Sequence, residues 1–184
     1  MHSTRLLQCT LLLALPLAFT ACTVPPLGFS RPEAAPLELA SGETRSIDFF
    51  TASRNLDSGI LLQEGTRYAL AVVTLSHWID GDIETNENGE PLDQRGFSNA
   101  LMPFAYLGTF RRSPEHRWFE LMLYQKGCKG ESLRGISELT MDESSGSYQF
   151  VAPCDGKLTL FVNDSFGFYG NNAGYANIAL SRVN

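Results

Sequence analysis

The chain has 184 residues, of which 43% are hydrophobic and 18% are charged, with ordinary contents of glycine and proline. This composition excludes a collagen, a coiled coil and a wholly disordered chain. The formal net charge of −6, without any cluster of Lys and Arg, predicts that nucleic acid is not a partner.

Residues 1–21 have the pattern of an export signal. Arg5 gives a positive start, and the apolar run 11–18 is too short to span a membrane and ends at Ala21 before Cys22. The arrangement resembles a bacterial lipoprotein signal peptide, whose cysteine is acylated before cleavage, so we expect lipidation of Cys22. The alternative is an ordinary secretory signal cleaved after Ala21. Thr23 follows the cysteine, and by resemblance to lipoprotein sorting this favours the outer membrane.

Residues 22–40 are predicted to form the lipidated cysteine and a tether. Four prolines in this stretch disfavour helix and strand and favour extended polyproline conformations. Fully extended, such a spacer reaches about 55 Å.

Cys128 and Cys154 remain if the signal peptide is removed and Cys22 is lipidated. In an oxidising compartment an even number of cysteines is most simply explained by a disulfide, and the alternative is two free buried thiols. On the chain-entropy model a loop of this length contributes roughly 3 kcal/mol.

Residues 41–184 show short apolar stretches with alternating polarity, separated by turn residues. Such spacing predicts an all-β, antiparallel β-sandwich. In the segment 116–125, we expect Phe119, Leu121 and Leu123 to face the core and Trp118 and Met122 to face outward. A short helix is expected near 98–101. The predicted strands are 44–50, 59–63, 68–75, 116–125, 148–152, 157–163 and 175–182.

Catalytic motifs are missing from the sequence, which contains no G-x-S-x-G elbow, P-loop, dinucleotide fingerprint or H-E-x-x-H. The protein is therefore predicted to bind a ligand rather than to be an enzyme.

The acidic loop 79–96 begins like a calcium loop, with Asp80, Asp82 and Glu84 in alternate positions. It departs from an EF-hand at Thr85, where glycine is needed, and at Pro91, where glutamate is needed. The alternative interpretation is a solvated acidic loop.

The loop 163–174 gathers Asp164, Asn171 and Asn172 among three glycines. Carboxylate, amide and backbone carbonyl oxygens are the ligands that calcium prefers, and they suit zinc or copper poorly. The alternative is a long hairpin connection that uses Asn and Gly for turn conformations.

This loop carries a family resemblance. The pattern is an alternating strand, Asn163-Asp164, four variable residues, then Tyr-Gly-Asn-Asn-x-Gly at 169–174 and a final strand. It is similar to the calcium-dependent galactose-binding lectins of the LecA (PA-IL-like) family. The resemblance implies a sandwich of jelly-roll, galactose-binding-like type. It also implies a Ca²⁺ held by Asp164, the Phe168 carbonyl, Asn171, Asn172 and a first-loop carbonyl, most plausibly that of Trp78.

The same resemblance implies a sugar subsite next to the calcium. Its members would be Asp164, Phe168, Asn171, Gln94 and Asp93. The family's first-loop motif His-Pro-Asp-Gln corresponds here to residues 91–94, so Gln94 is kept and the histidine is replaced by Pro91.

The sequence thus predicts a membrane-tethered, calcium-dependent carbohydrate-binding lipoprotein of the cell envelope, with a galactose-type sugar as the implied ligand. One alternative is a periplasmic lipoprotein that binds an envelope protein, as an inhibitor or immunity protein does. A third is a hydrolase of cell-wall glycans.

Overall fold

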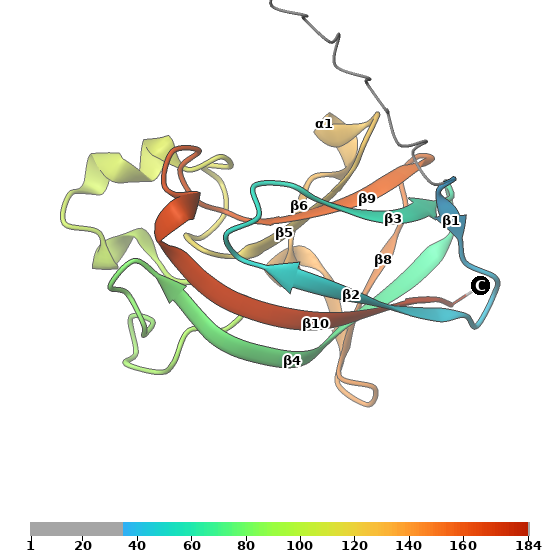
Figure 1. Ribbon diagram of the computed structural model, residues 1–184, viewed down its shortest axis with the longest axis horizontal. Coiled ribbons are helices and arrows are strands. Elements are labelled where there is room, and N and C mark those ends of the chain that lie inside the picture. Colours follow the sequence, from blue (N-terminus) through green and yellow to red (C-terminus); the bar gives the residue numbers. More distant parts are fainter. Residues whose placement is uncertain (1–34, 184) are drawn as a thin grey trace, which may run out of the picture. The chain divides into compact units, whose positions relative to one another are not determined.

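The computed structural model describes residues 35–183. The predicted signal peptide, Cys22 and most of the predicted tether lie outside these residues. The described chain forms two five-stranded sheets packed face to face (Figure 1), which confirms the predicted all-β sandwich.

One sheet has the strand order β1-β3-β9-β5-β6 and the other has the order β2-β10-β4-β8-β7. The strands are β1 (Leu37–Glu38), β2 (Thr44–Phe50), β3 (Leu56–Leu62), β4 (Arg67–Asp80), β5 (Leu121–Gln125), β6 (Arg134–Gly135), β7 (Thr140–Asp142), β8 (Ser147–Val151), β9 (Gly156–Val162) and β10 (Asn172–Arg182). The helical turns are η1 (Asn99–Leu101), η2 (Ala105–Phe110), α1 (Lys129–Ser132), η3 (Ile136–Glu138) and η4 (Tyr169–Asn171). None of the helices in the described part is long and apolar enough to cross a membrane.

The sheet β2-β10-β4 is built as the alternation predicts. Ala176, Ile178 and Leu180 of β10 are fully buried, and the residues between them are more exposed. β10 pairs antiparallel with β2 on one side and with β4 on the other. The buried side chains therefore face the other sheet and form one continuous core.

The domain begins earlier than its predicted start at residue 41. Leu37 and Glu38 form β1, which pairs parallel with Ile60 and Leu61 of β3, and Leu39 is buried in the core. The last residues of the predicted tether thus belong to the sandwich, and this edge pair departs from a purely antiparallel arrangement.

The segment predicted as a strand over 116–125 is a strand only from Leu121 onward. Phe119 has a positive φ of 59°, which interrupts extended structure before β5. The predicted outward face was also wrong, because Trp118 and Met122 are as buried as Leu121 and Leu123. The sequence around them therefore has core residues on both faces.

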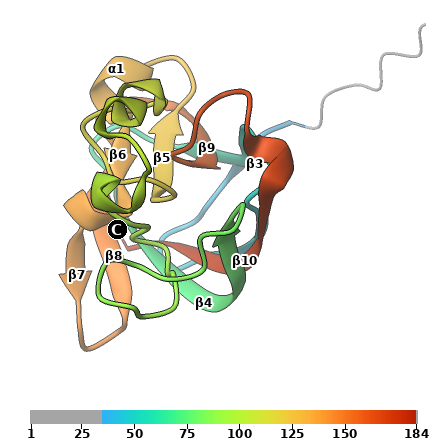
Figure 2. The same ribbon diagram turned by 90° about the vertical axis from the view of Figure 1, so that its left-hand side faces the viewer.

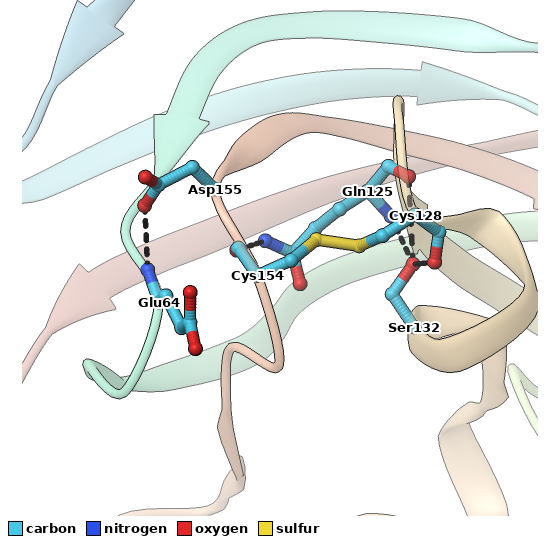
Figure 3. The surroundings of a disulfide bond; sticks show 6 residues. All are labelled: Glu64, Gln125, Cys128, Ser132, Cys154 and Asp155. Carbon is cyan, nitrogen blue, oxygen red and sulfur yellow. Dashed lines mark hydrogen bonds between the residues drawn. A yellow bond between two sulfur atoms is a disulfide. The ribbon is translucent and has the colours of Figure 1, made fainter.

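The Cys128–Cys154 disulfide is present, which confirms that prediction (Figure 3). It joins the start of α1 to the turn between β8 and β9. Around it, the Ser132 hydroxyl donates to the Cys128 carbonyl over 2.8 Å, and the Gln125 side-chain amide donates to the Cys154 carbonyl. The bond and its neighbours tie the short helix α1 to the edge of the sheet.

Candidate functional site

Three segments meet at one end of the sandwich (Figures 1 and 2). They are the end of β4, the insertion 97–118 that carries η1 and η2, and the loop 163–171 that leads into β10. Between them lies a cleft of about 920 Å³. Its lining residues are Asp80, Gly81, Asp82, Ile83, Met102, Tyr106, Leu107, Phe110, Trp118, Asp164, Ser165, Phe166, Gly167, Phe168 and Asn171.

A bulge in β4 decides which residue reaches the cleft. Tyr175 of β10 pairs with Ser76, but Ala173, two residues before it, pairs with Ile79, so β4 carries one extra residue here. His77 within this bulge has a φ of 52°. The irregularity places Trp78 in the core against Phe49 and Phe119, and brings Asp80 opposite Asn172 at the cleft.

Two carboxylates lie at the floor of the cleft. Asp80 and Asp164 are both largely buried, with exposed fractions of 9% and 2%. Burial raises the pKa of Asp80 to about 7, and the nearby charge of Asp164 adds to the shift. Burial also raises the pKa of Asp164. Ionising both of these buried carboxyl groups at once is unfavourable, because each would carry a poorly solvated negative charge next to the other. A cation bound between them would offset this cost.

Asn172 contributes an amide oxygen that has no hydrogen-bond donor. Its side chain is 8% exposed, and its amide nitrogen donates to Asp164 Oδ2 over 3.1 Å and weakly to the Thr51 carbonyl. The oxygen Oδ1 is buried without a partner. An unpaired buried acceptor beside two buried carboxylates is a costly arrangement that a bound cation relieves.

Asn171 and Phe168 also line the cleft. The Asn171 side chain lies over Gly81, where an added Cβ would be 2.9 Å from Asn171 Nδ2. Gly81 has a φ of +58°, a backbone conformation that favours glycine. The Phe168 carbonyl accepts one hydrogen bond, from the Asn171 amide over 3.0 Å, and retains a second lone pair.

The three glycines of the loop 163–174 differ in how tightly they are packed. A Cβ on Gly167 or Gly170 would meet nothing, and neither residue has a positive φ. A Cβ on Gly174 would lie 2.9 Å from the His77 carbonyl and 2.7 Å from Thr51. Close packing of β10 against its neighbours therefore requires only Gly174 of the three.

Asn163 holds the insertion against this loop. It is fully buried, its oxygen accepts from the Ser113 amide, and its nitrogen donates to the carbonyls of Ser113 and Arg117. The next residue, Asp164, accepts a backbone hydrogen bond from Arg112. The Asn163 side chain thus holds the insertion in place, and the neighbouring Asp164 side chain lines the cleft.

The structure does not bring every predicted site residue to the cleft. The side chain of Trp78 is buried in the core and donates from Nε1 to the Phe119 carbonyl. Gln94 donates to the Tyr148 hydroxyl over 2.9 Å, and Asp93 pairs with Arg95. Asp93 lines a separate hollow with Glu87 and Arg117.

From the sequence, Asp80 was placed at the start of a candidate calcium loop but was not connected with the loop 163–174, and the aromatic residues of this cleft were missed. Nothing local in the sequence shows that a bulge brings Asp80 opposite Asn172. Phe166, Tyr106 and Phe110 look like scattered apolar residues in the sequence. They all occur in segments whose sequence does not alternate as a strand does. Large apolar residues in such segments have no pattern that assigns them to the core, and this could have marked them as candidates for a binding site.

A row of Ser113, His116 and Glu138 invites comparison with a hydrolase triad. The Ser113 hydroxyl lies 2.6 Å from His116 Nδ1, and His116 Nε2 lies 2.9 Å from Glu138 Oε2. Ser113 is buried, however, and its backbone groups bond to Asn163. A buried hydroxyl in a turn does not present a nucleophile to a substrate, so we assign this row a structural role.

Within residues 35–183, no three His, Cys, Asp or Glu side chains cluster closely enough to hold a metal ion by themselves. A cation at the floor of the cleft would therefore depend on amide and carbonyl oxygens as well as on Asp80 and Asp164. This donor chemistry matches calcium.

No protein-family model matches the chain, and no curated protein matches it. Among solved structures, the chain is similar to one described as "EclA N-terminal domain; PllA-like lectin". The two share 20% sequence identity at a TM-score of 0.45, over 74% of this chain and 94% of that one.

Proposed function

We propose that the protein is a membrane-tethered, calcium-dependent carbohydrate-binding lipoprotein. The observation that carries this proposal is the buried, unpaired Oδ1 of Asn172 beside the carboxylates of Asp80 and Asp164. The resemblance of residues 163–174 to the loop of calcium-dependent galactose-binding lectins supports it independently.

Asp164, Asn171, Asn172, the Phe168 carbonyl and Asp80 would hold the calcium. Asp80 takes the place that the sequence assigned to the Trp78 carbonyl, because Asp80 lines the cleft and pairs with Asn172. Two carboxylates would neutralise the ion, and their ionisation would be favoured by its charge.

The sugar would occupy coordination positions that open into the cleft. Calcium accepts six to eight oxygens, so a set of five protein ligands leaves room for two hydroxyls of one sugar ring. Asp82 and the exposed Asn171 amide lie beside these positions and can hydrogen-bond the ring. Gln94 and Asp93 are not part of this set, since their side chains bond elsewhere.

Calorimetry with calcium alone tests the metal site. We expect heat of binding and a rise in the melting temperature, because an ion that binds only the folded state stabilises it by about 2.7 kcal/mol at a hundredfold excess over Kd. Asp164→Ala should abolish both effects, and Asn172→Ala should weaken them less.

The matched control is Asp57→Ala, which removes a carboxylate from β3 outside the cleft and should leave calcium binding intact. Wild-type protein that shows neither heat nor thermal shift at millimolar calcium would refute the metal site.

A glycan array probed with calcium and again with EDTA tests the sugar. Signals that persist in EDTA would contradict calcium dependence.

A further inference from the structure

Arg112 lies in the insertion 97–118 and contacts both ends of the loop 163–171, which supplies most of the proposed calcium ligands. Near the start of the loop, its backbone N–H donates to the Asp164 carbonyl over 3.2 Å. Near the end of the loop, its Nη1 donates to the Tyr169 hydroxyl over 2.8 Å, at the first residue of η4. One residue of the insertion thus joins the Asp164 end of the site to the helical turn η4.

The Tyr169 hydroxyl extends this connection to the backbone on the other side of Asp164. Tyr169 is fully buried, and its hydroxyl donates to the Val162 carbonyl over 2.5 Å. The same carbonyl accepts the Asp164 amide over 3.0 Å. The amide of Asp164 is therefore held through Val162 and Tyr169, and its carbonyl is held by Arg112 directly. Because a side chain moves with its backbone, these bonds restrict where the Asp164 carboxylate can lie.

The guanidinium of Arg112 is itself fixed by the turn between β2 and β3 and by an aromatic ring. Nη1 also donates to the Arg54 carbonyl, and Nη2 donates to Asn55 Oδ1 over 2.8 Å. Its Cζ lies 3.7 Å from the centroid of the Phe161 ring. A planar guanidinium with five N–H groups can serve these acceptors together, whereas a lysine ammonium on a flexible chain cannot keep the same arrangement.

The charge of Arg112 has two opposing effects on a metal at Asp164. Burial raises the pKa of Asp164, and the positive charge of Arg112 acts against this rise by favouring the carboxylate. The same positive charge repels a cation bound to that carboxylate. Since these two effects act against each other, we expect the geometry of the Arg112 contacts to decide its influence on the metal.

We propose that Arg112 is a positioning residue, which holds Asp164 and η4 in the arrangement that binds calcium before the ion arrives. Ligands that are already ordered lose less conformational freedom when the ion binds. The insertion would thus contribute to the metal site through Arg112, without supplying any of the proposed ligands. This inference rests on the proposed function, because it concerns the same metal site.

The first test compares the calcium affinities of wild type, Arg112→Lys and Arg112→Gln by calorimetry. Loss of a residue that orients metal ligands typically lowers the affinity by about tenfold to hundredfold, and we expect both variants to fall in this range. Arg112→Lys keeps the positive charge, so its loss of affinity separates the effect of geometry from that of charge.

Arg54→Gln is the matched control. It removes an exposed guanidinium that lies 5.8 Å from the Phe166 ring, but it keeps the backbone carbonyl to which Arg112 donates. This variant should bind calcium as tightly as wild type. Thermal melts in EDTA show whether each variant is folded at the temperature of the titration.

Hydrogen exchange in EDTA tests the positioning without the ion. The backbone amides of 164–171 should exchange faster in Arg112→Lys than in wild type, whereas the amides of the sheet β2-β10-β4 should keep their rates. A residue that served only the overall stability of the fold would instead raise exchange throughout the protein and leave the calcium affinity of the folded protein unchanged.

Tyr169→Phe is a milder second variant, because it removes only the hydroxyl that links Arg112 to Val162. It should lower the calcium affinity in the same direction, and it decides the question alone if the Arg112 variants do not fold. Wild-type or tighter calcium binding by Arg112→Lys, or by Tyr169→Phe in that case, would overturn this inference and leave the metal site standing. Absence of calcium binding by the wild type would remove the proposed metal site and this inference together.

Discussion

At the scale of single residues, Asp80 is notable as a carboxyl group in a buried environment. It is buried, it faces a second buried carboxylate, and its pKa is raised from 3.8 to about 7. The folded protein therefore holds a proton that the unfolded chain releases near pH 4. Stability from this source is present at low pH and is lost as pH rises through about 7.

This sign leads to a prediction for the calcium-free protein. In EDTA, wild type should lose stability relative to Asp80→Asn between pH 5 and pH 8, by no more than roughly 3 kcal/mol. Urea unfolding across this pH range measures the difference. Parallel stability curves for the two proteins would contradict the assignment of this loss to Asp80.

The affinity for calcium should depend on pH in the opposite direction to the stability of the calcium-free protein. If the ion binds the ionised pair, its affinity should rise with pH through the range in which Asp80 loses its proton. Calcium titrations at pH 6 and pH 8 give the comparison, and equal affinities at both would show that Asp80 is not a ligand.

At the scale of elements, Asn163 connects the loop 163–171 to the insertion by three buried hydrogen bonds. Asn163→Ala should lower the free energy of unfolding by about 2–4 kcal/mol, since the Ser113 and Arg117 groups lose their partner. Hydrogen exchange should also increase across 111–117. Asn177→Ala is the control, because its partly exposed side chain bonds at the surface to Ser46 and Asp48, and we expect a change within about 0.5 kcal/mol.

The disulfide is a second feature that links secondary-structure elements, since it joins the start of α1 to the turn before β9. The Cys128→Ser/Cys154→Ser variant should lose about 3 kcal/mol of stability, because its unfolded chain regains the freedom of a 26-residue loop. Denaturant unfolding measures this loss. Two alkylatable thiols in exported wild-type protein would show that the bond does not form in the cell.

Element by element, strands with one buried face could be predicted from sequence, and β2 matches its predicted range. β5 lies inside the predicted strand 116–125, but its start and its burial on both faces could not be predicted, because the positive φ of Phe119 and the covering of the outer face have no local sequence pattern. The insertion has short helical turns without a 3.6-residue period, so it gives no pattern. At the site, Asp164, Asn171 and Asn172 follow from a local motif, whereas Asp80 depends on a bulge set by strand pairing.

At the scale of the whole molecule, the proposed anchor can be tested directly. Cys22→Ser should move the protein from the detergent-extracted membrane fraction to the soluble fraction, because acyl chains give durable membrane attachment. Cell fractionation followed by immunoblotting measures the distribution. A mutant that still fractionates with membranes would place the anchor elsewhere.

The point at which the described chain enters the sandwich lies far from the cleft. β1 pairs with the last residues of β3, beside the first residue of β9, whereas the cleft lies past the last residues of β9 and β4. The entry and the end of β4 that lines the cleft are thus separated by the 14 residues of β4, or roughly 40 Å. Figure 1 shows β1 and the arrowhead of β4 at opposite ends of the sandwich. Attachment through the amino-terminal side of the chain would therefore leave the cleft unobstructed, because the attachment point is at the other end of the sandwich.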